Sequence, residues 1–205
     1  MNKGDTSVRR KRPFRDPGKL ALIVCEGNKT EPNYFHEIRK LRRLSSLSVE
    51  IVQGKTAGNH PKLLVDYAKR ARAKLKKQGL NYDQIWCVFD RDAHEGIDLA
   101  FDNAKRNGIE IAFSNPSFEI WLLLHFTLRT AYIDRNAALS QVKKYILGYE
   151  KKMEGVYGKL ISRLSAAKQN ADALRKFHIK NQNPETENPS TTVDKLTSYL
   201  ENFAS

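Results

Sequence analysis

The chain contains very little cysteine: Cys25 and Cys87 are the only two among its 205 residues. Each lies inside an apolar run, and neither belongs to a Cys-x-x-Cys pair or to a spacing typical of zinc ligands. Isolated cysteines in apolar runs are typical of small buried side chains in a reducing compartment. This pattern argues against a disulfide framework and against a cysteine nucleophile.

Long apolar runs are also absent. No segment approaches the ~20 apolar residues of a transmembrane helix. The basic N-terminal residues are not followed by the apolar h-region that a secretory signal requires. We therefore expect a cytoplasmic protein that has no membrane partner.

Acidic residues are in the minority, since 23 of them stand against 36 lysines and arginines and leave a formal net charge of +13. Such an excess favours an anionic partner, usually nucleic acid, although lysines that only keep a protein soluble are the alternative. Residues 1–18 are basic, polar and without apolar periodicity. They predict a flexible basic N-terminal arm, which either contacts phosphates or serves only as a solubilising leader.

The first half of the chain alternates apolar runs of strand length with helical patterns. Strands are expected at residues 20–25, 49–53, 85–89 and 109–113, and helices at 32–44, 61–78 and 95–106. This alternation predicts a parallel sheet with right-handed crossovers. We therefore expect an α/β core at residues 19–116, with a four-stranded parallel sheet and helices on both faces.

The pattern changes after the Asn115-Pro116-Ser117 tripeptide. Helices are expected at residues 118–126, 135–153, 156–177 and 191–203, with a loop at 181–190. Residues 117–205 therefore predict a helical C-terminal part packed on the core.

Carboxylates follow two of the predicted strands. Glu26 comes after the first strand, where Gly27 leaves room for a phosphate, and Asp90 and Asp92 come after the third. Groups at the carboxyl ends of parallel strands share one crevice, and side chains at i and i+2 of an extended segment point the same way. Converging carboxylates repel one another unless a cation joins them, and oxygen ligands suit Mg²⁺ or Mn²⁺. An ordinary turn is the alternative for the Asp-x-Asp alone.

Two further glutamates are candidates for the same site. Glu31 starts the next helix, where it either faces the same strand end or only stabilises the helix dipole. Glu119 is the one carboxylate in the apolar segment 118–126, where an unpaired charge would cost several kcal/mol. We favour a metal ligand or catalytic base at Glu119, with a structural salt bridge to an arginine as the alternative.

Basic residues near the strand ends are candidates for phosphate contacts. The loop at residues 54–59 suggests a phosphate cradle but is not a Walker A motif, because Val49 occupies the position of its first glycine. This loop is either a phosphate contact or an ordinary surface loop, and the basic face of helix 61–78 either tracks a nucleic-acid backbone or is merely solvated. The candidate phosphate-binding residues are Lys29, Lys55, Lys62, Arg70 and Arg91.

These motifs together resemble the RloB family of bacterial proteins, which carry a Toprim domain. The resemblance rests on IVCEGNKTEPNYF at residues 23–35, DRD at 90–92, NPSFEIWLLLHF at 115–126 and NPSTTV at 188–193. It implies a Toprim fold, with a glutamate after the first strand and an Asp-x-Asp after the third. Through it, Glu26 is expected to be a general acid/base or ligand, and Asp90 and Asp92 are expected to hold metal.

The resemblance also implies an activity class. Toprim proteins cut or join phosphodiesters with Mg²⁺, and RloB-like proteins resemble the nuclease branch, are linked to restriction loci and anti-phage defence, and often stand beside an ATPase partner. The implied substrate is DNA or an RNA such as tRNA. No tyrosine-bearing DNA-gate domain and no primase zinc module are evident in the sequence, which disfavours a topoisomerase or a primase.

Our hypothesis from the sequence is a metal-dependent endonuclease. Its metal ligands would be Glu26, Asp90, Asp92 and Glu119, holding one or two Mg²⁺ ions. Glu26 or Glu31 would accept the proton of the attacking water. A non-catalytic nucleic-acid-binding subunit of a defence complex is the rival hypothesis, and an Asp-x-Asp phosphatase ranks below both. The sequence leaves open the number of metals and whether the chain forms a homo-oligomer.

Overall fold

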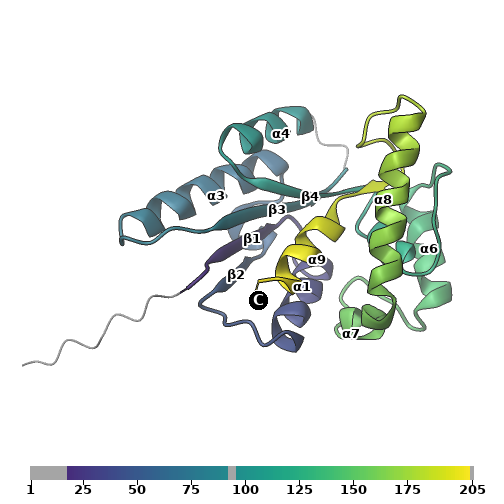
Figure 1. The fold of residues 1–205 in the computed structure, drawn as a ribbon, viewed down its shortest axis with the longest axis horizontal. Helices are drawn as coiled ribbons and strands as arrows, with labels where there is room; N and C mark the ends of the chain where they lie inside the picture. Colours follow the sequence, from purple (N-terminus) through teal and green to yellow (C-terminus); the bar gives the residue numbers. More distant parts are fainter. Residues whose placement is uncertain (1–17, 92–95, 204–205) are drawn as a thin grey trace, which may run out of the picture.

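The computed structural model describes residues 18–91 and 96–203. Within them lies one sheet of five strands in the order β2-β1-β3-β4-β5 (Figure 1). The strands are β1 (Ala21–Cys25), β2 (Val49–Val52), β3 (Gln84–Asp90), β4 (Glu110–Asn115) and β5 (Ser190–Thr191). The first four are mutually parallel, as predicted, whereas β5 pairs antiparallel with β4. The sheet is therefore mixed, and its fifth strand was not predicted.

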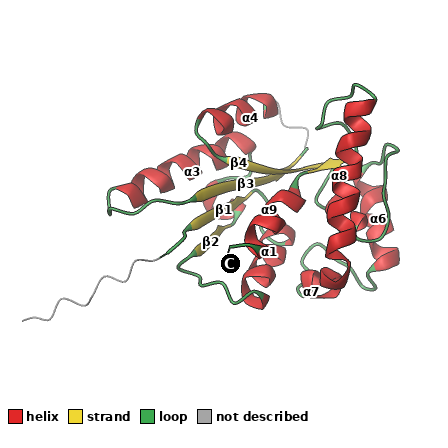
Figure 2. Ribbon diagram, in the orientation of Figure 1, coloured by secondary structure: helices red, strands yellow, loops and turns green. Residues whose placement is uncertain are grey.

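The two faces of the sheet bury alternate side chains of the strands. On β1, Leu22 and Val24 pack towards α3 (Pro61–Lys76) and α4 (Ile97–Arg106). Its other side chains pack towards α1 (Thr30–Leu41) and α9 (Val193–Glu201) on the opposite face (Figure 2). Both faces are thus covered, which explains why the parallel strands are continuous apolar runs rather than alternating ones.

Four helices of the C-terminal half lie at the end of the sheet towards which its parallel strands run (Figure 1). They are α5 (Glu119–Leu124), α6 (Arg135–Tyr145), α7 (Val156–Leu160) and α8 (Leu164–Lys180). Buried side chains of α5 belong to the same apolar core as those of α1 and the sheet. The C-terminal helices are therefore continuous with the core of the α/β unit.

Several predicted helix boundaries were wrong. The predicted helix at 135–153 ends at Tyr145, because Ile146 adopts an extended conformation. The one at 156–177 is broken by a 3-10 turn, Ile161–Arg163, and continues as α8 to Lys180. The loop at 54–59 begins instead with the short helix α2 (Gly54–Ala57). The predicted basic arm lies outside the described residues except for Gly18. No helix in the described ranges has both the length and the apolar character needed to span a bilayer.

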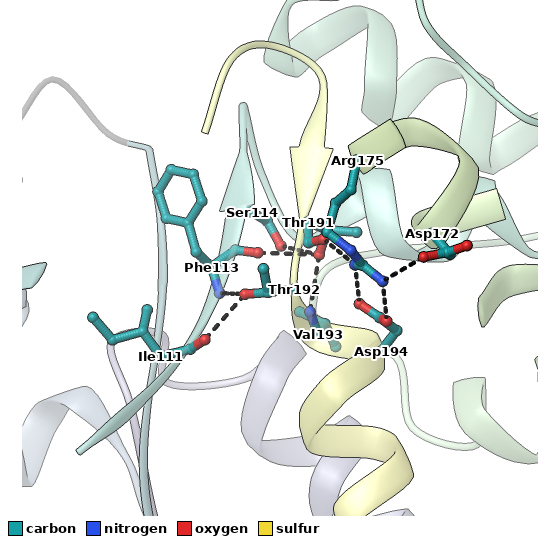
Figure 3. A network of polar contacts seen from close by, with 9 residues as sticks. All are labelled: Ile111, Phe113, Ser114, Asp172, Arg175, Thr191, Thr192, Val193 and Asp194. Atoms are coloured by element: carbon teal, nitrogen blue, oxygen red, sulfur yellow. Dashed lines mark hydrogen bonds and ion pairs between the residues drawn. The ribbon is translucent and has the colours of Figure 1, made fainter. Parts of the chain in front are cut away.

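A polar network anchors β5 and α9 to β4 (Figure 3). The Thr192 hydroxyl accepts a hydrogen bond from the Phe113 N–H at 2.9 Å and donates one to the Ile111 carbonyl at 3.0 Å. This side chain thus continues the β4–β5 hydrogen bonding beyond the end of β5. Arg175 of α8 forms a two-point ion pair with Asp194 of α9, with both N–O distances 2.9 Å. The network fixes the carboxyl end of β4, which stops at Asn115, directly before the helical part.

We expect loss of the Arg175–Asp194 ion pair to destabilise the protein. The two side chains are 15% and 9% exposed, so Arg175→Met leaves a largely buried carboxylate without its cation. The expected loss in the free energy of unfolding is about 2–3 kcal/mol, measured by urea denaturation. The matched control is Lys176→Met on the same helix, whose exposed pair with Asp172 predicts a change within about 0.5 kcal/mol. Equal losses in the two variants would contradict this assignment.

Candidate functional site

The strand order creates a crevice between β1 and β3. From β1 the chain runs to β2 on one side, whereas from β3 it runs to β4 on the other, so the connections diverge at the carboxyl ends of β1 and β3. Such a switch point is the usual place for a ligand in an open α/β sheet. Glu26 directly follows β1 and Asp90 ends β3, and the Asp90 N–H donates to the Glu26 carboxylate at 3.4 Å. The structure thus brings together two of the predicted site residues.

Glu31 reaches the same crevice from the first turn of α1. A Cβ atom placed on Gly27 would lie only 2.0 Å from Glu31 Oε2, so the carboxylate occupies the space that glycine leaves open. The crevice is a cavity of about 460 Å³. Its lining residues are Glu26, Gly27, Asn28, Lys29, Thr30, Glu31, Asn59, Asp90, Arg135 and Lys151.

The segment after β2 supports the loop that follows β1. The Gly54 N–H donates to the Gly27 carbonyl at 3.3 Å, and the Lys55 N–H donates to Asn28 Oδ1 at 2.6 Å. A Cβ atom on Gly54 would lie 1.8 Å from the Glu26 carbonyl oxygen. This predicted phosphate cradle therefore uses two of its N–H groups to hold the Glu26 loop in place.

Glu119 is held by hydroxyl groups. It is 2% exposed, and its two carboxylate oxygens accept hydrogen bonds from the Ser117 hydroxyl at 2.6 Å and the Tyr149 hydroxyl at 3.3 Å. A carboxylate in an apolar segment needs a metal ion, an arginine or strong hydrogen bonds to offset the cost of its burial. In the described structure, hydrogen bonds stabilise the Glu119 carboxylate. Lone pairs on both oxygens remain for a further ligand.

The carboxylates of this site interact through their charges. Burial raises the pKa of Asp90 well above its ordinary value, and the negative charges of Glu31 and Glu119 raise it further. Burial likewise raises the pKa of Glu31, with a further contribution from Glu119. Arg135 opposes both shifts. Negative charges from separate segments therefore disfavour the ionised forms of Asp90 and Glu31, a condition that a bound cation relieves.

Two basic residues of the site were missed from the sequence. Arg135 Nη2 lies 3.7 Å from Asp90 Oδ2 and also donates to the Pro116 carbonyl at 3.2 Å. Lys151 lies in the loop after α6. Its backbone carbonyl accepts a hydrogen bond from the Thr30 hydroxyl at 2.6 Å. The sequence did carry one signal for Arg135. It is the first residue of a helix, directly after the N-cap Asp134, and a positive charge is unfavourable at a helix N-terminus unless another interaction compensates for it. For Lys151 the sequence carries no such signal.

The predicted phosphate-binding residues separate in space. Lys29 lines the carboxylate cavity, and Arg91 lines a neighbouring one. Lys55 and Lys62 are exposed on α2 and at the start of α3. Arg70 lines a different cavity, with Glu50 and Tyr82. The described structure therefore brings only Lys29 to the carboxylates themselves.

The residues of the predicted metal site are brought together in part, and their role as metal ligands stays a prediction. Asp92 lies outside the described residues, and among those described no group of three or more His, Cys, Asp or Glu side chains is arranged to hold a metal ion. The carboxylates that do meet, led by Glu26 and Asp90, form an all-oxygen donor set beside cationic side chains. Mg²⁺ in proteins is commonly held by one or two carboxylates, together with waters and substrate phosphates. This donor set fits such an ion.

The fold and site define an α/β protein with an acidic crevice at a topological switch point. The family profile described as RloB-like protein matches residues 21–200, and the chain belongs to this family. The match spans the sheet, the acidic crevice and the C-terminal helices. Comparisons with curated proteins and with solved structures gave no match.

Gly54→Ala is expected to destabilise the protein. Alanine normally favours a helix over glycine by up to ~1 kcal/mol, but here its Cβ would meet the backbone oxygen of Glu26, which no side-chain rotation can relieve. We expect a loss of about 2 kcal/mol or more in the free energy of unfolding, measured by urea denaturation. Gly27→Ala should cost less, because the Glu31 side chain in its way can rotate. The reverse order would contradict the close contact between these loops.

Asp90→Asn is expected to stabilise the metal-free protein at neutral pH. The raised pKa values of Asp90 and Glu31 mean that folding favours their protonated forms, so stability falls as the pH rises from the unfolded pKa towards the folded one. The variant should flatten this fall and raise the Tm at neutral pH by several degrees, since about 1 kcal/mol corresponds to ~2–4 °C at this size. Thermal denaturation in EDTA across a pH series measures it. Exposed Asp102→Asn is the control, and an unchanged pH dependence in Asp90→Asn would refute the explanation.

Proposed function

We propose that the protein is a metal-dependent nuclease that cleaves phosphodiester bonds in nucleic acid. The observation that carries this proposal is the contact between Asp90 and Glu26 at the switch point, where the negative charges of Glu31 and Glu119 also act on Asp90. Buried like charges are destabilising, and proteins retain them mainly where function requires them. The net charge of +13 supports a polyanionic substrate.

Each residue of the crevice has a proposed role. Glu26, Asp90 and Asp92 would hold Mg²⁺ or Mn²⁺, with Glu119 as a further ligand behind them. When bound, the ion would polarise the phosphodiester and lower the pKa of an attacking water. Glu31, whose pKa is raised by burial, is proposed as the general base, with Glu26 as the other candidate.

Cationic side chains would position the substrate. Lys29 and Lys151 line the cavity from two different loops, and Arg135 lies beside Asp90. Phosphate contacts of this kind fix the register of a nucleic acid without reading its sequence. We propose that these three residues hold the phosphates on either side of the cleaved bond.

The Toprim assignment belongs to the same proposal. A glutamate after β1, an Asp-x-Asp after β3 and the parallel order β2-β1-β3-β4 support it. The family resemblance supports a role in anti-phage defence, with DNA or an RNA such as tRNA as substrate and an ATPase as partner. The second candidate function is a non-catalytic nucleic-acid-binding subunit of a defence complex, which the excess of positive charge alone would support.

Cleavage assays test the proposal directly. Labelled tRNA, single-stranded DNA and duplex DNA are incubated with the protein, alone and with its ATPase partner, in Mg²⁺, Mn²⁺ or EDTA. We expect metal-dependent cleavage that falls by at least ~100-fold in Asp90→Ala and Glu26→Gln, because each removes an oxygen ligand, and that is unchanged in Asp102→Asn. Absence of cleavage under all these conditions, or cleavage indifferent to Asp90→Ala, would refute a nuclease at this site.

Metal binding separates the two candidate functions without relying on activity. Isothermal titration with Mg²⁺ and Mn²⁺ should detect binding in the unmodified protein and none in Asp90→Ala. A binding subunit would give no heat at this site, while still binding nucleic acid.

A further inference from the structure

A second cavity adjoins the carboxylate crevice. Its volume is about 430 Å³, within the range of small-molecule sites. It lies between the ends of β3 and β4, the segment before α6 and the loop before β5. Its lining residues are Arg91, Asn115, Pro116, Tyr132, Pro184, Thr186, Glu187 and Asn188.

The linings of the two cavities are connected at two points. Arg91 lines the second cavity and is the next residue after Asp90, which lines the first. Pro116 lines the second cavity, and its carbonyl accepts the hydrogen bond from Arg135, which lines the first. A chain with a phosphate in the carboxylate crevice can therefore place its neighbouring nucleotide in the second cavity.

Asparagine side chains hold the walls of this cavity together. The Asn188 side chain accepts a hydrogen bond from the Ile133 N–H at 3.0 Å and donates one to the Ile133 carbonyl at 2.9 Å. Both backbone polar groups of Ile133 are therefore bonded to one side chain. Asn115 donates to the Thr186 carbonyl at 2.8 Å. Three segments that are distant in the sequence are thereby fixed before any ligand binds.

This framework presents an exposed aromatic ring. Tyr132 is 73% exposed, although its neighbour Ile133 is buried and doubly bonded by Asn188. The Arg129 side chain also donates to the carbonyls of Ala131 and Tyr132, at 3.2 and 3.5 Å. The backbone at Tyr132 is thus held on both sides, while the ring remains open to a partner. An aromatic ring presented in this way is suited to stacking on a nucleobase.

The charges of the cavity define where a phosphate can lie. Arg91 is exposed and forms no ion pair with any carboxylate in the described part of the chain. Glu187, on another wall, accepts a hydrogen bond from the Asn188 N–H at 3.0 Å and would repel a phosphate. A phosphate is therefore favoured at the Arg91 side, next to the carboxylate crevice, and an uncharged base is favoured further in.

We propose that this cavity binds an unpaired nucleobase adjacent to the cleaved phosphodiester, with the base stacked on Tyr132 and its phosphate contacted by Arg91. The inference rests on the proposed nuclease function and specifies its substrate as a single-stranded or unpaired segment of DNA or RNA. A base within a duplex stays stacked between its neighbours and cannot lie against the Tyr132 ring.

Equilibrium binding in EDTA tests the subsite without requiring cleavage. Fluorescence anisotropy is measured with single-stranded DNA and RNA of about ten nucleotides, with a duplex of the same sequence and with a mononucleotide competitor. We expect single strands to bind more tightly than the duplex. Tyr132→Ala should weaken single-strand binding by roughly 5- to 150-fold, the loss expected for one stacked base.

Three further variants make the test specific. Tyr132→Phe should retain binding and Tyr132→Leu should lose it, because leucine keeps apolar area but has no aromatic face. Leu147→Ala, at a side chain that is 92% exposed elsewhere on the surface, should bind as the unmodified protein does. Photocrosslinking with iodouridine oligonucleotides, followed by mass spectrometry, should identify Tyr132.

The outcomes distinguish this inference from the proposed function. Single-strand binding that is unchanged in Tyr132→Ala, or equal in Tyr132→Leu and Tyr132→Phe, overturns the subsite, even if metal-dependent cleavage is observed. A Tyr132-dependent preference for single strands without any cleavage supports the subsite and refutes the nuclease. Failure of the unmodified protein to bind single strands overturns the subsite.

Discussion

The structure depends on one electrostatic constraint: carboxylates from separate segments must lie close together at the junction of β1 and β3. The pKa of Asp90 and that of Glu31 are both raised, first by burial and then by neighbouring negative charge. Carboxylates held this close together repel one another when they are ionised. Hydroxyl donors to Glu119, the guanidinium of Arg135 and the main-chain N–H groups at the strand ends reduce the repulsion without removing it. The surrounding loops are packed closely enough to keep the carboxylates in place, as the contacts at Gly27 and Gly54 show.

The C-terminal helices complete the site as well as the core. Arg135, Tyr149 and Lys151 all come from residues that follow β4, and each contacts or influences the carboxylates. The two Asn-Pro-Ser segments of the sequence meet at this junction, where Asn115 of β4 lies opposite Ser190 of β5. Asn188 then joins Asn115 to Ile133 at the start of the helical part. The helical part is therefore a structural component of the crevice, and an isolated sheet domain would lack the cations Arg135 and Lys151 and the Tyr149 hydroxyl.

Much of the fold was predictable because its signals are local. The four parallel strands are apolar runs covered on both faces, and their positions were predicted to within a few residues. Strand β5 was missed because two residues carry no periodicity and its pairing depends on threonine side chains that bond to a strand nearly eighty residues earlier. The convergence of Glu26 and Asp90 followed from the parallel order of the strands. Arg135 and Lys151 instead reach the site because α6 packs on α5 and the loop after α6 bonds to α1. No sequence spacing encodes that packing. The role of Asp92 stays a prediction, because it lies outside the described residues.

The arrangement of charge distinguishes the proposed enzyme from a simple binding protein. A module that only holds nucleic acid gains by placing cations at its deepest contact point, because carboxylates there repel the phosphates it must bind. In this crevice the carboxylates lie at the strand ends and the cations, Lys29, Arg135 and Lys151, surround them. A phosphate can approach such a centre closely only if a further positive charge accompanies it, which is the role a divalent ion plays in phosphodiester cleavage. The acidic centre therefore supports the proposed metal-assisted chemistry over plain binding, and the Tyr132 ring would supply an uncharged contact for the base proposed beside it.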